Sequence, residues 1–354
     1  LTINLNDLHT NLGGRDLSFA TRVSAESHVA ASLFGITGGW YATVEGVVSG
    51  GIPNQLFGFL VNGNEIDTKI QDKADIVGRV FADSGVYAGV RFNREWHVGM
   101  KVGAFAPIFY TDPASNVSFS LETDSDTGTT TVTGGVDVKA YSAINFEALE
   151  TLNSPEAIIG LLEGRKVDIG IIRADRRKPL YGVNLSGITL KPAVVQNSVA
   201  FQFEESVEVV NPLGGYDPEA DDPLSTVLLT PEEVTAEPTY ETDLEKPIRM
   251  PMQIGGFYRL QSLPLIDVIG HGQFYFGDGA QLSIGGIVEG SFFPLNTLSA
   301  GIGYDRGMWH TTAGLKLNLW LMELGVDVGM AAPTFGKLFR GGGVSLKLYS
   351  AIGL

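Results

Sequence analysis

Apolar and polar residues alternate along much of the second half of the chain. From Trp309 to Leu321 the odd positions read Trp, Thr, Ala, Leu, Leu, Leu and Leu, and mostly polar or small residues stand between them. After a slip at Leu321-Met322 the alternation resumes as far as Met330. A period of two is typical of β-strands, because successive side chains point to opposite faces. The pattern therefore predicts two long strands joined by a very short turn.

The same period predicts strands along most of the chain. A Thr37-Gly38-Gly39 break between the first two apolar runs indicates a hairpin turn. The other strands are expected at 76–82, 84–93, 95–107, a hairpin over 118–144, 166–174, 179–190, 197–210, 248–260, 265–276, 280–293, 298–305, 308–320, 321–332 and 340–354. We expect an all-β fold of about 14 strands, with an uncertainty of about two.

Four segments depart from this pattern. Residues 1–24 are polar and irregular and predict an N-terminal arm or plug, which leaves 25–354 for the barrel. Short amphipathic helices are expected at 53–62 and at 149–163, the second within an insert over 145–164. The segment 212–246 is acidic and rich in proline, so we expect a long solvated loop there.

The apolar strand faces contact either a protein core or lipid. The predicted strands reach ten or more residues, which suits tilted membrane strands better than average globular ones. Aromatic residues gather near strand ends, at Trp40-Tyr41, Trp96, Phe109-Tyr110, Tyr304, Trp309, Phe335 and Phe339, as in the girdles of membrane barrels. The chain also stops inside a predicted strand, whose edge a closed sheet would cover. These features favour a closed antiparallel transmembrane β-barrel, and a soluble β-rich binding protein remains the rival interpretation.

Composition excludes several classes of function. A formal charge of −16 argues against nucleic acid as a partner, because phosphate contacts need clustered Lys and Arg. The absence of cysteine excludes disulfides, thiolate metal sites and cysteine nucleophiles. The 45 glycines favour sheets and turns over helical bundles. The most apolar stretch, 28–44, is too short and too rich in glycine for a helical membrane span.

No catalytic or metal motif is found in the sequence. The five histidines show no metal-ligand spacing, and no nucleophile elbow or phosphate-binding loop is present. We therefore expect no enzyme activity, no cofactor and no metal. The candidate site residues are instead polar side chains on the predicted inner strand faces, where they would line a lumen and contact a ligand: His97, Lys101, His310, Lys316, Asn318 and Asp327.

Several runs together resemble a known family. They are IPNQLFGFLVNGN, VYAGVRFNREWHVGMKVG, LSGITLKPAVV, KPIRMPMQIGGFY and MWHTTAGLKLNLWLMELGVDVGM, spread over about residues 50 to 354. The pattern is similar to spirochaete-type outer-membrane barrels of the long-chain fatty-acid transporter (FadL) superfamily. That resemblance implies a fourteen-stranded barrel and passage of hydrophobic molecules. The N-terminal Asn-Pro-Ala hatch motif of that group is missing here.

Two functions follow as hypotheses. The first is a bacterial outer-membrane barrel, in contact with membrane lipids, that lets small hydrophobic molecules such as fatty acids pass through a lumen gated by the two short helices. The alternative is a structural or assembly barrel with a plugged lumen that contacts neighbouring proteins. The sequence does not identify a substrate.

Overall fold

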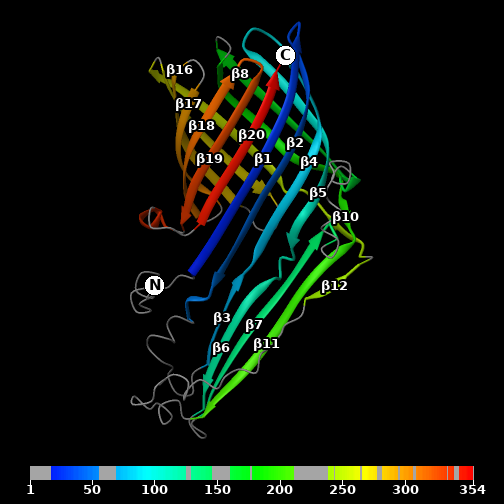
Figure 1. Cartoon of the computed structure of the whole chain (residues 1–354), viewed down its shortest axis with the longest axis vertical. Coiled ribbons are helices and arrows are strands. Elements are labelled where there is room, and N and C mark those ends of the chain that lie inside the picture. The colour runs from blue at the N-terminus through cyan, green and yellow to red at the C-terminus, as the bar shows by residue number, and fades with distance from the viewer. Residues whose placement is uncertain are drawn as a thin grey trace.

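A computed structural model of the chain describes residues 17–55, 69–124, 129–145, 160–175, 178–210, 238–242, 244–263, 265–276, 281–293, 296–305, 308–332, 334–338 and 343–353. Within this part the protein is almost entirely β-sheet, which confirms the predicted fold class. Figure 1 shows a barrel in the upper half of the molecule and a narrow sheet projecting below it.

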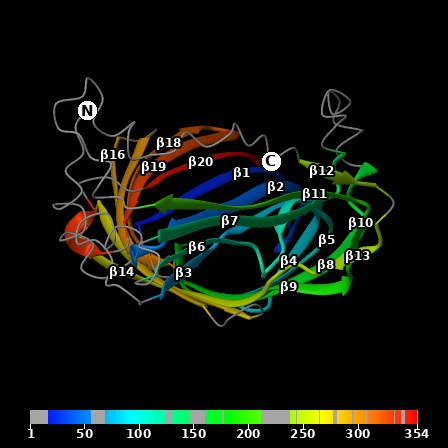
Figure 2. The same ribbon diagram turned by 90° about the horizontal axis from the view of Figure 1, so that it is seen from below.

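Thirteen strands of the described chain close into the barrel. In order around the wall they are β1 (Leu17–Leu33), β2 (Ile36–Ile52), β4 (Val77–Arg91), β5 (Trp96–Thr111), β8 (Gly164–Asp175), β9 (Lys178–Lys191), β14 (Met252–Leu263), β15 (Ile266–Phe276), β16 (Gln281–Phe293), β17 (Asn296–Asp305), β18 (Met308–Leu319), β19 (Met322–Ala332) and β20 (Gly343–Gly353). Seen from below in Figure 2, they form an oval wall.

The barrel closes through a parallel pair. β1 pairs with β20 from Arg22↔Ser345 to Ala30↔Gly353, whereas its other neighbour, β2, is antiparallel. An odd number of up-and-down strands forces this arrangement, because the first and last strands then run in the same direction. The expected antiparallel barrel of about 14 strands is therefore corrected to a mixed barrel of 13. Closure covers both terminal edges, as the sequence argument required.

A second sheet contains the predicted strands that the barrel does not use, together with β3, which the sequence did not predict. β3 (Lys69–Asp75), β6 (Asn116–Thr123), β7 (Thr129–Ser142) and β11 (Asn197–Val210) pair in that order. The sheet joins the wall where Tyr110 and Thr111 of β5 pair with β7. In Figure 1 it extends downward from the wall of β4 and β5, and in Figure 2 β6 and β7 lie in front of part of the opening.

Three short strands complete the described fold. β12 (Thr239–Glu241) adds to β11, and β10 (Ala193–Val195) pairs with β13 (Lys246–Ile248) as a separate ribbon. Val195 and Ile248 of this ribbon pack with Phe81, Phe105 and Tyr141 in a buried cluster at the lower rim. A single turn of 3-10 helix, η2 (Phe335–Lys337), precedes β20.

One turn and one domain boundary differ from the sequence expectation. The first hairpin turns at Phe34-Gly35, with φ of 51° and 84°, and Thr37 to Gly39 lie inside β2. Positive φ at both residues is typical of two-residue hairpin turns, whose twist matches that of the flanking strands. The turn therefore forms at Phe34-Gly35 and not at the later Gly38-Gly39 pair. β1 begins at Leu17, so residues 17–24, which were expected to belong to the arm, are part of the barrel wall.

Some expectations lie outside the described residues. These are residues 1–16 of the arm, most of the two predicted helices (56–68 and 146–159) and most of the acidic loop (211–237). The described end of that loop forms β12 and β13.

Candidate functional site

The barrel wall has an apolar outer face and a polar inner face. Outward positions on neighbouring strands carry exposed Val, Ile, Leu and Met side chains, for example Val86, Val98, Ile169 and Val328, with exposed fractions between 45% and 59%. Inward positions of the same strands carry the titratable side chains described below. The alternation seen in the sequence therefore places apolar side chains on the outer surface and polar side chains in the lumen.

Aromatic rings mark two levels of the outer face. Near the upper rim Trp96 and Tyr181 meet edge to face, and Tyr181 stacks on Tyr258, with centroids 5.7 and 6.3 Å apart. Near the lower rim Tyr304, Trp309 and Phe335 form a second chain of rings, with centroids 5.5 and 5.3 Å apart. These clusters occupy the positions that interfacial girdles would take.

Two of the predicted girdle residues do not lie on the outer face, and Phe339 lies outside the described residues. Tyr110 packs against the buried cluster of Phe81 and Phe105, and Tyr41 is the second exception. Its side chain faces the lumen and is 1% exposed. Trp40, its neighbour in β2, points outward, because adjacent residues of a strand face opposite sides.

The predicted lumen residues lie on the inner face but do not form one site. His97 and Lys101 line a cavity of about 390 Å³ toward the upper rim, and His310 and Asp327 line another of about 450 Å³ on the side of β16 to β20. Lys316 pairs with Glu323 at 3.2 Å, and Asn318 stands opposite Glu323 in the β18–β19 register. The residues therefore spread around the wall.

A buried charged cluster lies between these cavities. Lys166 of β8 is 6% exposed, and its Nζ lies 2.6 Å from Asp83 Oδ2 and 3.2 Å from Asp168 Oδ2. The backbone N–H of Gly187 donates to Asp168 Oδ1 at 2.7 Å. Asp83 belongs to β4, so the Asp83–Lys166 contact crosses over β5 and ties together strands that do not pair.

Tyr41 completes this cluster. Lys101 Nζ and Lys166 Nζ lie 4.8 and 5.8 Å from the centre of its ring. A Cβ at Gly103 of β5 would clash with the Tyr41 hydroxyl. The Tyr41 ring can therefore extend along the inner face from β2 to β5 only because Gly103 lacks a side chain. We call Tyr41, Asp83, Lys101, Lys166 and Asp168 the lumen cluster.

The inner cavities share lining residues. A third cavity of about 230 Å³ is lined by all five residues of the lumen cluster and, from the segment before β14, by Met250 and Pro251. It shares Lys101 and Asp168 with the upper cavity, and Glu26 and Arg79 with the larger one. The three cavities thus lie next to one another along the inner face, and the smallest of them is the one at the lumen cluster.

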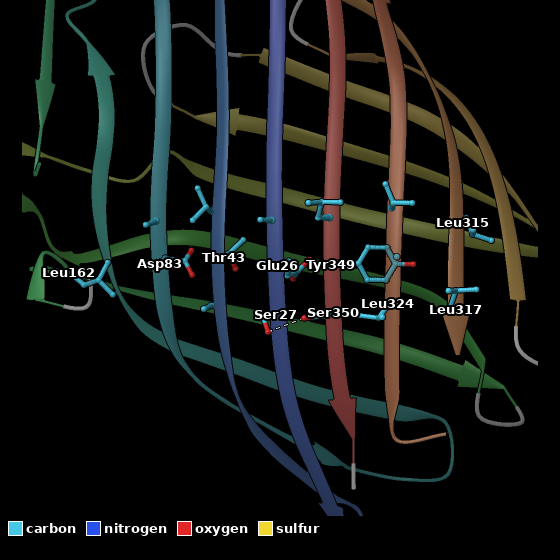
Figure 3. Close-up of a pocket in the computed structure, with 17 residues that line it drawn as sticks. Glu26, Ser27, Thr43, Asp83, Leu162, Leu315, Leu317, Leu324, Tyr349 and Ser350 are labelled. Carbon is cyan, nitrogen blue, oxygen red and sulfur yellow. Dashed lines mark hydrogen bonds between the residues drawn. The ribbon is translucent and has the colours of Figure 1, made fainter. Parts of the chain in front are cut away.

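A separate groove of about 640 Å³ lies on the outer face, across β4, β2, β1, β20, β19 and β18. Small residues such as Ala25, Ala42 and Ala82 form its floor, Leu162 lies at one end, and Leu315 and Leu317 lie at the other. Figure 3 shows this row of side chains from Leu162 to Leu315. We call it the outer groove.

One polar contact crosses the floor of the outer groove. Ser350 Oγ donates to Ser27 Oγ at 3.1 Å, across the parallel β1–β20 closure (Figure 3). Ser350 is the polar residue that interrupts the apolar face of the last strand in the sequence. Its hydroxyl is satisfied by the neighbouring strand, which explains why a polar group is tolerated there.

Sequence reasoning did not single out Tyr41, Asp83, Lys166 and Asp168. Lys166 and Asp168 share one face of β8 by simple alternation, which was a usable signal. The contact with Asp83 requires knowing that β8 follows β5 around the wall, and the pattern of a single strand does not contain that information.

Within the described residues, no group of three or more His, Asp or Glu side chains is placed to hold a metal ion. No helix in the described part of the chain is long and apolar enough to cross a membrane.

Comparisons with known proteins add little to this picture. No protein-family model and no curated protein matches the chain. Among solved structures it matches a mutant of the ferric enterobactin receptor (PfeA) of Pseudomonas aeruginosa, at 8% identity and a TM-score of 0.19. The match covers 94% of this chain but 57% of the receptor chain, so the chain spans little more than half of that protein. A likeness this weak carries no argument about function.

Proposed function

We propose that the protein is a bacterial outer-membrane barrel that lets small solutes cross through its lumen without covalent chemistry. The observation that carries this proposal is the row of neighbouring cavities on the inner face of a closed wall with an apolar exterior. Closed barrels are one of the two architectures that satisfy every backbone polar group within a membrane.

The height of the apolar outer face supports the membrane setting. Trp309 and Leu319 stand at opposite ends of the outward face of β18. At about 3.3 Å per residue and a tilt of about 40°, roughly 25 Å separates them along the barrel axis. Known outer-membrane barrels carry an apolar band of about that height between aromatic girdles. The lower girdle begins at Trp309, where it meets Tyr304 and Phe335.

The inner surface favours polar cargo. The lumen cluster places two carboxylates and two ammonium groups around the smallest of the inner cavities. A fatty acid moving through it would leave these groups desolvated against hydrocarbon, which is costly. We therefore propose small polar solutes as the cargo of the lumen, in place of the fatty acids that the family resemblance implied.

Conductance in planar lipid bilayers tests this function. We expect stepwise single-channel currents from the purified full chain, and Lys101→Glu should shift ion selectivity toward cations, because it reverses a charge in the shared part of the path. Lys139→Glu is the matched control, since Lys139 lies in the projecting sheet and pairs with Glu241 outside the lumen. Inserted protein that carries no current above the bare bilayer would refute passage through the lumen.

An assembly role is the second candidate, and the projecting sheet favours it. Described residues of β3, β6, β7 and β11 extend well beyond the barrel rim, where a neighbouring protein could contact them (Figure 1). Deletion of 112–142 together with 197–241 would remove most of that sheet. The assembly role predicts loss of co-purifying outer-membrane proteins with conductance retained, whereas an unchanged set of co-purifying proteins would refute it.

A further inference from the structure

We infer that the outer groove holds one phospholipid of the surrounding membrane, with an acyl chain along the groove and the lipid phosphate at Arg165. The inference rests on the membrane setting proposed above but not on passage through the lumen. It assigns a binding role to a surface that the transport proposal does not use.

The lining of the groove fits hydrocarbon. Every described outward-facing residue that lines it is apolar or a serine, and the two serines bond to each other. Glu26, Thr43, Asp83 and Tyr349 also line the groove, but they alternate with the outward residues of their strands, so their side chains belong to the inner face and leave no free charge at the floor. Its volume of about 640 Å³ lies within the range of ordinary small-molecule sites. An acyl chain can bury apolar surface there without leaving a polar group unpaired.

The groove differs from the rest of the outer wall. Elsewhere on this wall, residues such as Val86, Val98 and Leu298 stand out from the surface at 45% to 59% exposed. At Ala25, Ala42 and Ala82 the side chains end at Cβ, and Leu162 rises beside them from the segment that precedes β8. A chain lying on this floor is flanked by Leu162 at one end and by Leu315 and Leu317 at the other.

Arg165 provides the polar end of the site. It follows Leu162 closely in the chain, at the lower end of β8, opposite Ala104 of the outer face. Its Nη1 donates to the carbonyls of Leu162 and Gly164 at 2.7 and 2.9 Å, which fixes the guanidinium beside the groove. The side chain is exposed and, within the described part of the chain, forms no ion pair. Its remaining N–H groups can bind a phosphate.

The position along the wall favours a phospholipid over a free fatty acid. Ala25 lies about 20 Å below Leu33 at the upper rim, at about 3.3 Å per residue and a tilt of about 40°, so the groove is in the lower part of the apolar band. The lipid headgroups on the lower side of the membrane then lie at the level of Arg165. A phosphate can bind the planar guanidinium through two N–H groups. This end of the groove therefore prefers a phospholipid headgroup.

Native mass spectrometry and photolabelling test the inference. The full chain is extracted in mild detergent, and bound lipid is counted after detergent exchange. In vesicles of phosphatidylethanolamine and phosphatidylglycerol, a phospholipid with a diazirine in its acyl chain is activated and the labelled peptides are mapped. We expect one retained phospholipid per barrel and labelling concentrated on β1, β2 and β20.

Matched variants decide the location. Ala25→Trp fills the floor and should reduce retention and labelling at least tenfold, and Ala42→Phe is a second filling variant in case the first does not fold. Ala31→Trp is the control, because Ala31 is also an exposed outward residue of β1 but lies outside the groove. Arg165→Gln should lower retention of the phospholipid at least threefold. Equal labelling of Ala25→Trp and Ala31→Trp would show annular lipid only and overturn the inference.

Further measurements distinguish a phospholipid from a free fatty acid, and the lipid site from the transport proposal. A diazirine fatty acid that labels the groove as well as the phospholipid, with no effect of Arg165→Gln, would also overturn the inference. Retention in detergent does not depend on conductance, so a silent barrel that retains lipid refutes only the transport proposal. A conducting barrel without retained lipid refutes only the lipid site.

Discussion

At the scale of residues, the lumen cluster shows how a barrel can bury charge within its wall. Lys166 lies between Asp83 and Asp168 with both carboxylates largely buried, and Lys101 in the same cavity brings the second positive charge that balances them. Gly103 provides the room, because any side chain there would displace the ring of Tyr41. A strand position without a side chain thus allows a contact between strands that are not neighbours.

Removal of Lys166 should therefore destabilise the barrel. Lys166→Met leaves two buried carboxylates without their partner, and we expect a loss of about 3 to 5 kcal/mol in the free energy of unfolding. The double variant Lys166→Met with Asp83→Leu should recover part of this loss. Urea unfolding in lipid vesicles measures both effects, and a single variant as stable as the wild type would show that the cluster is solvated.

A second residue-scale prediction concerns pH and the lower rim. Hydrogen bonds from the Ala114 N–H and the Tyr141 hydroxyl, with Lys246 3.7 Å away, lower the pKa of Asp112. Because the folded pKa lies below the unfolded one, this stabilisation is present above about pH 4 and is lost as the pH falls through the folded pKa. Asp112→Asn should remove that part of the acid dependence of urea unfolding. The carboxylate is partly exposed, so we expect less than about 1 kcal/mol.

At the scale of elements, the parallel closure of β1 on β20 is directly testable. Ser27 and Ser350 face each other in this register, with their oxygens 3.1 Å apart. Since the chain has no cysteine, Ser27→Cys with Ser350→Cys should form a single clean disulfide on mild oxidation. Ser27→Cys with Tyr349→Cys is the control, because Tyr349 faces the lumen. Equal cross-linking of the two pairs would contradict the register.

Sequence reasoning predicted individual strands well and their assembly less well. From β14 to β20 successive strands pair with each other, so alternation and short turns were enough to locate them within a few residues. β6, β7 and β11 show the same alternation but leave the barrel, because β5 pairs with β8 over Trp96–Phe105 and with β7 only near its end. Pairing between distant strands is not encoded in the period of either strand.

The candidate site shows the same division. His97, Lys101, His310, Lys316, Asn318 and Asp327 lie on the inner face because alternation fixes which side a residue occupies. The lumen cluster was not predicted as a unit, because its members come from β2, β4, β5 and β8. Whether any of these side chains contacts a ligand stays a prediction.

At the scale of the whole molecule, the two rims of the barrel differ. Tight turns such as Phe34-Gly35 and Trp320-Leu321 occupy the upper rim, where Phe34 and Trp320 are 96% and 99% exposed. The connections to the projecting sheet leave from the lower rim (Figure 1). In the proposed orientation the apolar band reaches the short turns, and the sheet extends into water on the other side. This asymmetry places the aromatic turn tips at one membrane interface.

The central claim is that the outward face of each strand contacts hydrocarbon while the inward face lines a polar lumen. Single cysteines at successive positions 309 to 319 of β18, each carrying a nitroxide label in lipid bilayers, test it most directly. We predict that oxygen, which partitions into lipid, reaches the odd positions, and that a water-soluble nickel complex reaches Thr312, Lys316 and Asn318. Accessibility without a period of two, or recovery of the full chain as a monodisperse species without any amphiphile, would contradict the account.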